Sequence, residues 1–213
     1  MFRFQQMRWA AVCVVVTGAV LATNAQASPI VVPLAAFGAP AVTFSEVPLG
    51  TPLNGLTING FSFTETVVNT TVANGGPGDT NSITQPAALG AGNPQGEVIT
   101  VNLPSLMSDF GFGYAILAGG VVPNAVTVTL FNGATNLGSL SYTASPDPNF
   151  PGGFAGIGNA TPFDRVTFSF TSTAAAYDFD NIRAITAVPE PATLTLVGAG
   201  VLALARRRRA PRA

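Results

Sequence analysis

Apolar side chains recur at every second position through most of the chain between residues 28 and 187. Residues 126–130 run Val-Thr-Val-Thr-Leu and residues 166–170 run Val-Thr-Phe-Ser-Phe, so apolar and hydroxyl side chains alternate. Because side chains of a strand point alternately to opposite faces, this pattern predicts strands with one buried face. Eight strands are predicted in this way, at 41–47, 56–65, 97–103, 109–118, 124–132, 136–143, 164–172 and 177–186.

Short glycine-containing sequences separate these predicted strands. They are Asn54-Gly55, Asn59-Gly60, Asn132-Gly133 and Pro151-Gly152-Gly153, all typical of turns. Asn132-Gly133 also predicts a hairpin that joins 124–132 to 136–143. Residues 73–96 contain many Gly, Asn and Pro and few large apolar groups, which predicts a long loop. Short strands with turns between them favour an all-β fold, an antiparallel β-sandwich or jelly roll.

The first 27 residues follow a different pattern, which is typical of a secretory signal peptide. Two arginines precede an apolar run over 9–21, which is too short to span a bilayer. A small-x-small cleavage site follows, with Ala25 and Ala27 as its small residues and Ser28 as the first residue of the mature protein. We therefore expect a signal-peptide helix in 1–27, with the Sec export machinery and signal peptidase as partners. An uncleaved anchor helix is the alternative.

The last 26 residues place a Pro-Glu-Pro triplet, an apolar run and a basic cluster in that order. The motif occupies 188–193 and includes Pro189, Glu190 and Pro191; the apolar run is 193–205; the cluster is Arg206, Arg207, Arg208 and Arg209. As a helix, the apolar run would extend only about 20 Å, which is short of the roughly 30 Å hydrocarbon core. It predicts a marginal transmembrane helix whose basic flank stays cytoplasmic, so the middle of the chain lies outside the inner membrane.

Charge divides the chain into the same three parts. Two arginines give residues 1–27 a formal charge of +2, and one acid with five arginines gives residues 188–213 a charge of +4. Between them, nine acids and two arginines give residues 28–187 a charge of −7. We therefore predict a signal peptide at 1–27, a β-sandwich domain at 28–187 and a sorting segment at 188–213.

The tripartite tail resembles the PEP-CTERM sorting signal of Gram-negative bacteria. The resemblance rests on the triplet, the short apolar run and the arginine cluster, and it covers 188–209. It implies recognition by an exosortase at Pro189, Glu190 and Pro191, transient membrane retention by the arginine cluster, and cleavage followed by release or attachment at the cell surface. Proteins with this signal often accompany exopolysaccharide and biofilm formation. A plain C-terminal anchor with a chance triplet is the alternative.

The sequence lacks several residue types that enzymes and nucleic-acid-binding proteins use. It has no His and no Lys, and its single Cys, Cys13, lies in the predicted signal peptide. This composition excludes Ser-His-Asp triads, His-based zinc sites, Schiff-base lysines and P-loop lysines. A Lys/Arg face for nucleic acid is also not expected. Glycosidase chemistry needs only two carboxylates and stays open, but no recognisable motif holds such a pair, so we expect no enzyme and no resident cofactor.

Two acids near the end of the domain form a pattern of their own. Asp178 and Asp180 are two residues apart in a predicted strand, so their side chains share one face, opposite Tyr177 and Phe179. After Asp180 the apolar positions change parity, to Ile182, which indicates a bulge or a strand end. Bulges re-aim side chains and often border sites.

Two stretches also resemble a β-sandwich type that is frequent in exported PEP-CTERM proteins. They are 42–51 with 59–63, similar to its first strand and hairpin, and 154–157, 163–168 and 180–183, similar to its last three strands. The resemblance implies that the first and last strands lie near one another in a jelly roll. Jelly-roll carbohydrate-binding modules commonly hold a structural calcium between an early acid and a late Asp, and by resemblance Glu46 and Asp180 occupy such positions. Carboxylate oxygens are ligands that calcium prefers. The alternative is that both acids are solvated or cap turns.

We expect an exported protein whose domain is a structural or adhesive component of the exopolysaccharide matrix. The alternative is a carbohydrate-binding module that recognises exopolysaccharide. The only Trp, Trp9, leaves with the predicted signal peptide, so Tyr114, Tyr142 and Tyr177 remain beside Phe for stacking on a sugar ring. An exposed aromatic platform would favour the binding module, whereas featureless faces would favour the structural role.

Overall fold

The computed structural model describes residues 27–67, 69–76, 79, 82–91, 97–146 and 150–188. In these ranges every strand pair is antiparallel, and the only helix is the single-turn 3-10 helix η1, Leu34–Ala36. The all-β, antiparallel prediction is therefore confirmed. The predicted signal-peptide and C-terminal apolar helices lie outside the described residues. Within the described part of the chain, no helix has the length and apolar character needed to cross a membrane.

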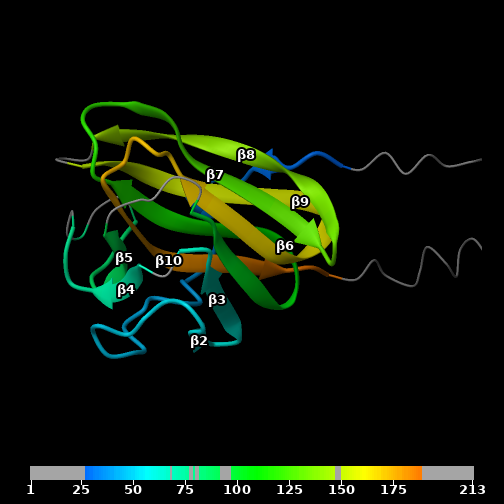
Figure 1. Cartoon of the computed structure of the whole chain (residues 1–213). Coiled ribbons are helices and arrows are strands. Elements are labelled where there is room, and N and C mark those ends of the chain that lie inside the picture. Colours follow the sequence, from blue (N-terminus) through cyan, green and yellow to red (C-terminus); the bar gives the residue numbers. More distant parts are fainter. Residues whose placement is uncertain are drawn as a thin grey trace, which may run out of the picture.

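The strands form one sheet in the described residues. They are β1 Ile30–Val31, β2 Thr57–Ile58, β3 Phe61–Glu65, β4 Thr70–Ala73, β5 Ala87–Ala91, β6 Ile99–Ile116, β7 Val122–Asn132, β8 Thr135–Pro146, β9 Pro151–Phe170 and β10 Ala176–Thr186. Their order is β4-β5-β10-β6-β9-β7-β8, with β1 paired to β9 and the β2–β3 hairpin paired to β6 (Figure 1). The first and last strands of the chain therefore lie on opposite sides of β6 and β9.

Strands β6 and β9 are long enough to belong to both halves of this sheet. They contain 18 and 20 residues, and their pairing register shifts between Asn102 and Met107. Such irregularities bend a strand. On the two sides of this bend lie Phe112 of β6 and Phe168 of β9, whose ring centroids are only 4.5 Å apart. The sheet therefore folds over, and its two halves face each other (Figure 1).

The space between the two halves is filled by aromatic side chains. Phe168 contacts Phe112 at 4.5 Å and Phe179 at 5.0 Å between ring centroids, and Phe170 stacks on Tyr177 at 4.3 Å. Each of these five rings is less than a tenth exposed. Offset and edge-to-face aromatic pairs stabilise a core beyond their buried area, so this cluster is the main contact between the halves.

The turn predicted at Pro151-Gly152-Gly153 is wrong, because these residues begin β9 and pair with β6 and β8. The turns predicted at the Asn-Gly dipeptides are confirmed. At Asn132-Gly133, Asn132 pairs with Thr135 and Gly133 has φ 55°, so β7 and β8 form the expected hairpin. At Asn59-Gly60 both residues have positive φ, 49° and 84°, and this turn joins β2 to β3. A positive φ favours Gly and Asn, which explains why these dipeptides mark the turns.

Several predictions of strand position are wrong. The single strand predicted at 56–65 is the hairpin of β2 and β3, and the separate strands expected at 154–157 and 163–168 both belong to β9. Segment 41–47 is not a strand, because only Val42 forms an isolated bridge, to Ile182, and Glu46 accepts a hydrogen bond from the Thr43 amide at 3.1 Å, which turns the chain. The predicted long loop at 73–96 contains β5 and begins at the last residue of β4. The strands predicted at 97–103 and 109–118 are the single strand β6. The bridge at Val42 nevertheless confirms that the early and late segments are neighbours.

The two ends of the described chain leave the sheet at the same end (Figure 1). Ile30 of β1 pairs with Gly158, which pairs with Asp109 of β6, and Asp109 also pairs with Ile185 near the end of β10. We call this the tail end. The distal end lies around Tyr177, where β10 begins, about 30 Å away at the rise of a β-strand.

Candidate functional site

Strand β10 carries two buried acids on the face that points away from the aromatic core. Tyr177 and Phe179 pack in the core, whereas Asp178 and Asp180, which are 2% and 0% exposed, point to the other face. The predicted shared face of the two acids is therefore confirmed. A segment almost a hundred residues earlier covers them: the Thr84 amide donates to Oδ2 of Asp180 at 2.9 Å.

The bulge predicted after Asp180 is present. The register between β6 and β10 shifts between Asp180 and Arg183, and Asn181 has φ 53°. The Asn181 side chain donates to the Ser82 carbonyl at 2.7 Å and to the Thr84 hydroxyl at 3.1 Å. The bulge thus points the Asn181 side-chain amide at the covering segment, and these hydrogen bonds hold that segment over the acids.

Most of the carboxylate oxygens on this face have no hydrogen-bond partner in the described part of the chain. They are both oxygens of Asp178 and Oδ1 of Asp180. Burial raises the pKa of Asp178 to about 7. Burial also raises the pKa of Asp180 to about 7. The backbone amides of Thr84 and Asn181 partly offset this rise, and the Glu46 carboxylate increases it. Near neutral pH, both acids can therefore hold or lose a proton.

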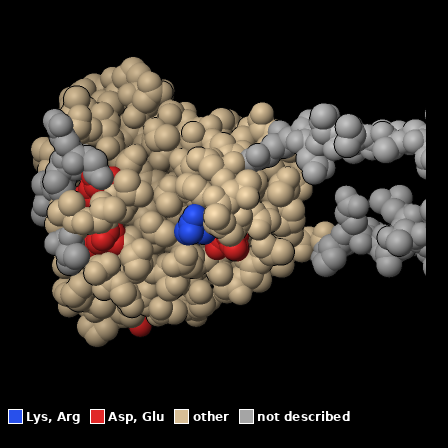
Figure 2. Space-filling view, turned by 45° about the vertical axis from the view of Figure 1, so that its right-hand side comes forward, with Lys and Arg blue, Asp and Glu red and all other residues tan. Residues whose placement is uncertain are grey.

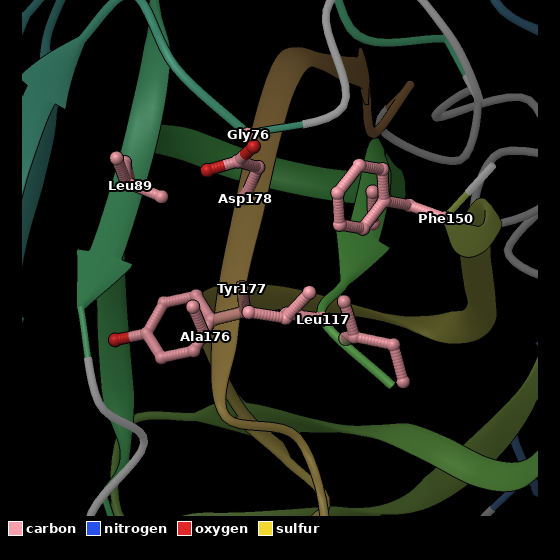
Figure 3. A pocket seen from close by; sticks show the side chains of 9 residues that line it. Gly76, Leu89, Leu117, Phe150, Ala176, Tyr177 and Asp178 are labelled. Atoms are coloured by element: carbon pink, nitrogen blue, oxygen red, sulfur yellow. The ribbon is translucent and has the colours of Figure 1, made fainter. Parts of the chain in front are cut away.

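A pocket of about 360 Å³ opens beside Asp178 at the distal end (Figure 3). Its described lining consists of Gly76, Leu89, Ala115, Ile116, Leu117, Phe150, Ala176, Tyr177 and Asp178. Asp178 lies in register between Leu89 of β5 and Ala115 of β6. The hydroxyl of Tyr177 is bonded to Thr70 at 2.8 Å. Within this described lining, the Asp178 carboxylate is thus the one polar side-chain group without a partner.

Sequence analysis missed a further buried acid, Glu97, which is 3% exposed. Burial raises the pKa of Glu97 to about 7; the nearby Tyr177 hydroxyl lowers it, and the Glu65 carboxylate raises it further. Phe150 and Gly76 of the pocket are not predicted from the sequence either. No local pattern marks them, because they come to lie beside Asp178 from segments distant in sequence.

The structure brings the predicted calcium ligands Glu46 and Asp180 into one neighbourhood. The rings of Phe44 and Phe179 next to them are 5.6 Å apart, and Glu46 adds to the pKa rise of Asp180. The Glu46 carboxylate accepts the Thr43 amide at 3.1 Å and 3.3 Å, as the turn-capping alternative expects. The described residues contain no group of three or more His, Cys, Asp or Glu side chains suited to a metal ion. Calcium binding by this pair stays a prediction.

The three tyrosines do not form an exposed platform. Tyr114 and Tyr177 are buried, and the hydroxyls of Tyr114 and Tyr142 donate to backbone carbonyls at 3.0 Å and 2.7 Å. Burial raises the pKa of all three above the usual range for tyrosine. The large hydrophobic side chains that are exposed in the described part are aliphatic: Ile30, Val31, Leu34, Leu49, Val67, Leu106, Leu117, Val121 and Val188. Among the described residues, the tyrosines therefore do not supply the exposed aromatic platform that a binding module of that type would use.

Of the residues predicted for processing, the structure describes Ala27 and Ser28. The Ala27 carbonyl accepts a hydrogen bond from the buried amide of Asn159 at 2.8 Å, so the chain is already held by the fold at the predicted cleavage site. Ala25, the Pro-Glu-Pro triplet and the arginine cluster lie outside the described residues.

Solved structures similar to this chain include family 29 carbohydrate-binding modules. One, described as a family 29 module, is 12% identical, covers 70% of this chain and 99% of its own, and has a TM-score of 0.39. A mutant of the module CBM29-2 is 11% identical, covers 68% and 96%, and has a TM-score of 0.40. Another CBM29-2 mutant, complexed with cellulohexaose, is 12% identical, covers 76% and 94%, and has a TM-score of 0.39. At these scores the likeness supports no conclusion about this chain.

Comparison with curated proteins gives no match. The family model for the PEP-CTERM protein-sorting motif matches residues 187–209. The matched range contains the Pro-Glu-Pro triplet, the apolar run and the arginine cluster. The chain therefore carries a PEP-CTERM protein-sorting motif at its C-terminal end, as its sequence predicts.

Proposed function

We propose that the described domain is a β-sandwich cargo that is exported and then sorted to the cell surface by an exosortase. The observation that carries this proposal is where the motif begins. Strand β10 ends at Thr186, and the matched motif starts at the next residue, Ala187, whose amide still donates to the Leu106 carbonyl at 3.0 Å. Val188 is 86% exposed. The sorting motif thus starts where the fold ends, at an accessible position.

The proposed partners follow from the two ends of the chain. The Sec machinery and signal peptidase act on residues 1–27, and the exosortase acts at Pro189-Glu190-Pro191. The arginines at 206–209 hold the tail transiently in the inner membrane until it is cleaved. Because both ends leave the sheet at the tail end, the distal end with its pocket faces away from the membrane during processing (Figure 1).

For the exported domain we propose a structural or adhesive role in the exopolysaccharide matrix. Most of its aromatic side chains pack in the core, and the face in Figure 2 consists mostly of uncharged residues with few acids or arginines. The domain at 28–187 has no Cys, so it needs no disulfide chemistry outside the cell. A second candidate, a carbohydrate-binding module, is favoured by one observation, the pocket with Asp178 and Phe150.

The sorting role is tested by replacing Pro189-Glu190-Pro191 with three alanines and fractionating the cells. We expect the variant to stay unprocessed in the inner membrane, with loss of the surface and matrix fractions. The chain offers a matched control, because Pro146-Asp147-Pro148 is a second proline-acid-proline triplet, inside the domain. Its replacement by alanines should leave the processing of the tail intact. Normal processing of the tail variant would overturn the proposal.

A further inference from the structure

The distal pocket contains a buried acid without a counter-charge, and we propose that it binds a ligand with a protonated amine and an apolar face, namely an amino-sugar residue of a cationic polysaccharide. The amine and the apolar face of the ligand are inferred from the chemistry of the pocket. The choice of a polysaccharide as the source rests on the proposed function in the matrix.

The amine is inferred from the surroundings of Asp178. This side chain is 2% exposed, it lines the pocket, and neither of its oxygens has a partner among the described residues. Both arginines of the domain are engaged elsewhere: Arg165 lies 4.5 Å above the Phe131 ring, and Arg183 donates to the Gly38 carbonyl. A buried carboxylate is costly unless it is protonated or paired. A protonated amine donates hydrogen bonds to the carboxylate and also neutralises its charge, whereas a hydroxyl can donate a hydrogen bond but carries no charge.

The apolar face is inferred from the rest of the lining. Figure 3 shows the Asp178 carboxylate between Leu89 and Phe150, with Leu117 across the opening. A sugar ring presents C–H groups that pack on an aromatic face, and an ammonium group is attracted to the same face. The pocket volume of about 360 Å³ lies in the range of small-molecule sites.

Two further features fit an organic cation. Gly76 lies directly against the Asp178 carboxylate, so a side chain at position 76 would collide with it and close this side of the pocket. Residues 28–187 carry nine acids and two arginines, so the domain as a whole attracts cationic polymers and repels anionic ones. The pocket then supplies the specific contact within this general attraction.

The test uses the full chain in phosphatidylcholine nanodiscs and calorimetric titration at pH 6.5 in about 0.15 M salt, which screens non-specific attraction. The probe is a tetrasaccharide of glucosamine, whose matched control is the same tetrasaccharide with every amine acetylated. We expect the amine form to bind at least tenfold more tightly. Asp178→Asn should weaken its binding at least tenfold and Phe150→Ala about fivefold. Asp164→Asn, which removes the same charge at another carboxylate, should change it less than threefold.

Proton release provides a second readout. Because burial raises the pKa of Asp178 to about 7, the free pocket is largely protonated at pH 6.5, and an incoming ammonium group should displace that proton. Titrations in two buffers with different ionisation enthalpies should show that the unmodified chain releases at most roughly three-quarters of a proton per fully protonated ligand, the protonated fraction of Asp178 at this pH. The Asp178→Asn variant should show none.

Four outcomes would overturn the inference. They are equal binding of the acetylated tetrasaccharide, unchanged binding by Asp178→Asn, equally tight binding of N-acetyl-lysine methylamide, which would indicate a protein side chain as ligand, and displacement of the probe by calcium at Asp178, which would indicate a metal site. The two proposals fail separately. Normal sorting without amine binding would reject only this inference, and amine binding without tail processing would reject only the sorting proposal.

Discussion

The two faces of strand β10 are equally buried but differ in how their polar groups are satisfied. On the core face, Phe179 packs among other rings, and the Tyr177 hydroxyl shares a hydrogen bond with Thr70. On the outer face, Asp178 and Asp180 are as deeply buried, yet three of their four oxygens have no partner within the described residues. Tyr177 and Phe179 therefore stabilise the folded state, whereas the ionised forms of Asp178 and Asp180 destabilise it. The contrast teaches that burial alone does not show whether a side chain stabilises the fold.

The largest effect should come from the core face. Phe179→Ala removes a ring that contacts Phe44, Phe112 and Phe168, and it leaves a cavity between the two halves of the sheet. We expect the free energy of unfolding to fall by about 3–5 kcal/mol. Urea denaturation of the full chain measures this loss. Phe154→Ala, on the outer face and only partly buried, is the control and should cost clearly less.

On the outer face, the buried charges should lower the free energy of unfolding, in contrast to the stabilising ring of Phe179. The pKa of Asp178 and of Asp180 is about 7 in the folded protein and near 3.8 in the unfolded chain, so between these values the folded state binds more protons. The free energy of unfolding should then fall as the pH rises from about 4 to 7, and level off above, since each pKa unit corresponds to about 1.4 kcal/mol. Denaturation at pH 5 and pH 8 should differ by a few kcal/mol, with pH 5 the more stable.

Substitution of Asp178 tests whether its buried carboxyl group causes this pH dependence. Asp178→Asn removes the buried charge at nearly constant volume, so it should stabilise the protein at pH 8 and reduce the pH dependence of stability, to which Asp180 and Glu97 still contribute. Asp164→Asn changes the same charge at a carboxylate that accepts the Gly133 amide, and it should leave the pH dependence in place. A loss of stability in Asp178→Asn at pH 8 would mean that the carboxylate is already paired.

The smallest effect is expected for the Tyr177 hydroxyl, the polar group on the core face that has a hydrogen-bond partner. Tyr177→Phe keeps the ring that stacks on Phe170 and removes the hydroxyl, which is bonded to Thr70 and also lies near Glu97. We expect a loss of about 1 kcal/mol. A double-mutant cycle with Thr70→Val isolates the shared bond. Additive losses would show that the bond contributes nothing, and would weaken the contrast between the two faces.

The sequence predicts those parts of this fold that local pattern determines. The Asn132-Gly133 hairpin follows from residues that tolerate positive φ, and the bulge after Asp180 follows from a change of apolar parity in the strand itself. Strand β5 was missed because its sequence is Ala-Ala-Leu-Gly-Ala, which has no strand signal. Its Gly90 is required because the Tyr177 ring occupies the space of a side chain there. That requirement comes from a residue far away in the sequence.

The candidate site was predictable only in part for the same reason. Alternation places Asp178 and Asp180 on one face, but alternate acids on a strand ordinarily indicate a face in water. Here the segment around Gly76 and Thr84 covers that face and excludes water. Long-range packing therefore decides whether these carboxylates are solvated or buried, and it also forms the pocket with Phe150.

The position of β10 has a mechanical consequence for a protein that stays attached to a cell by its C-terminal end. The strand begins beside the pocket at Ala176 and ends at Thr186, one residue before the sorting motif. A force applied to a polymer bound in the pocket would be transmitted along this one strand to the attachment point. Beside the pocket, over Tyr177–Phe179, β10 is bonded to both β5 and β6, so load that passes from the strand into the sheet there would act in shear across two ladders. The domain would then resist flow without unzipping from an edge.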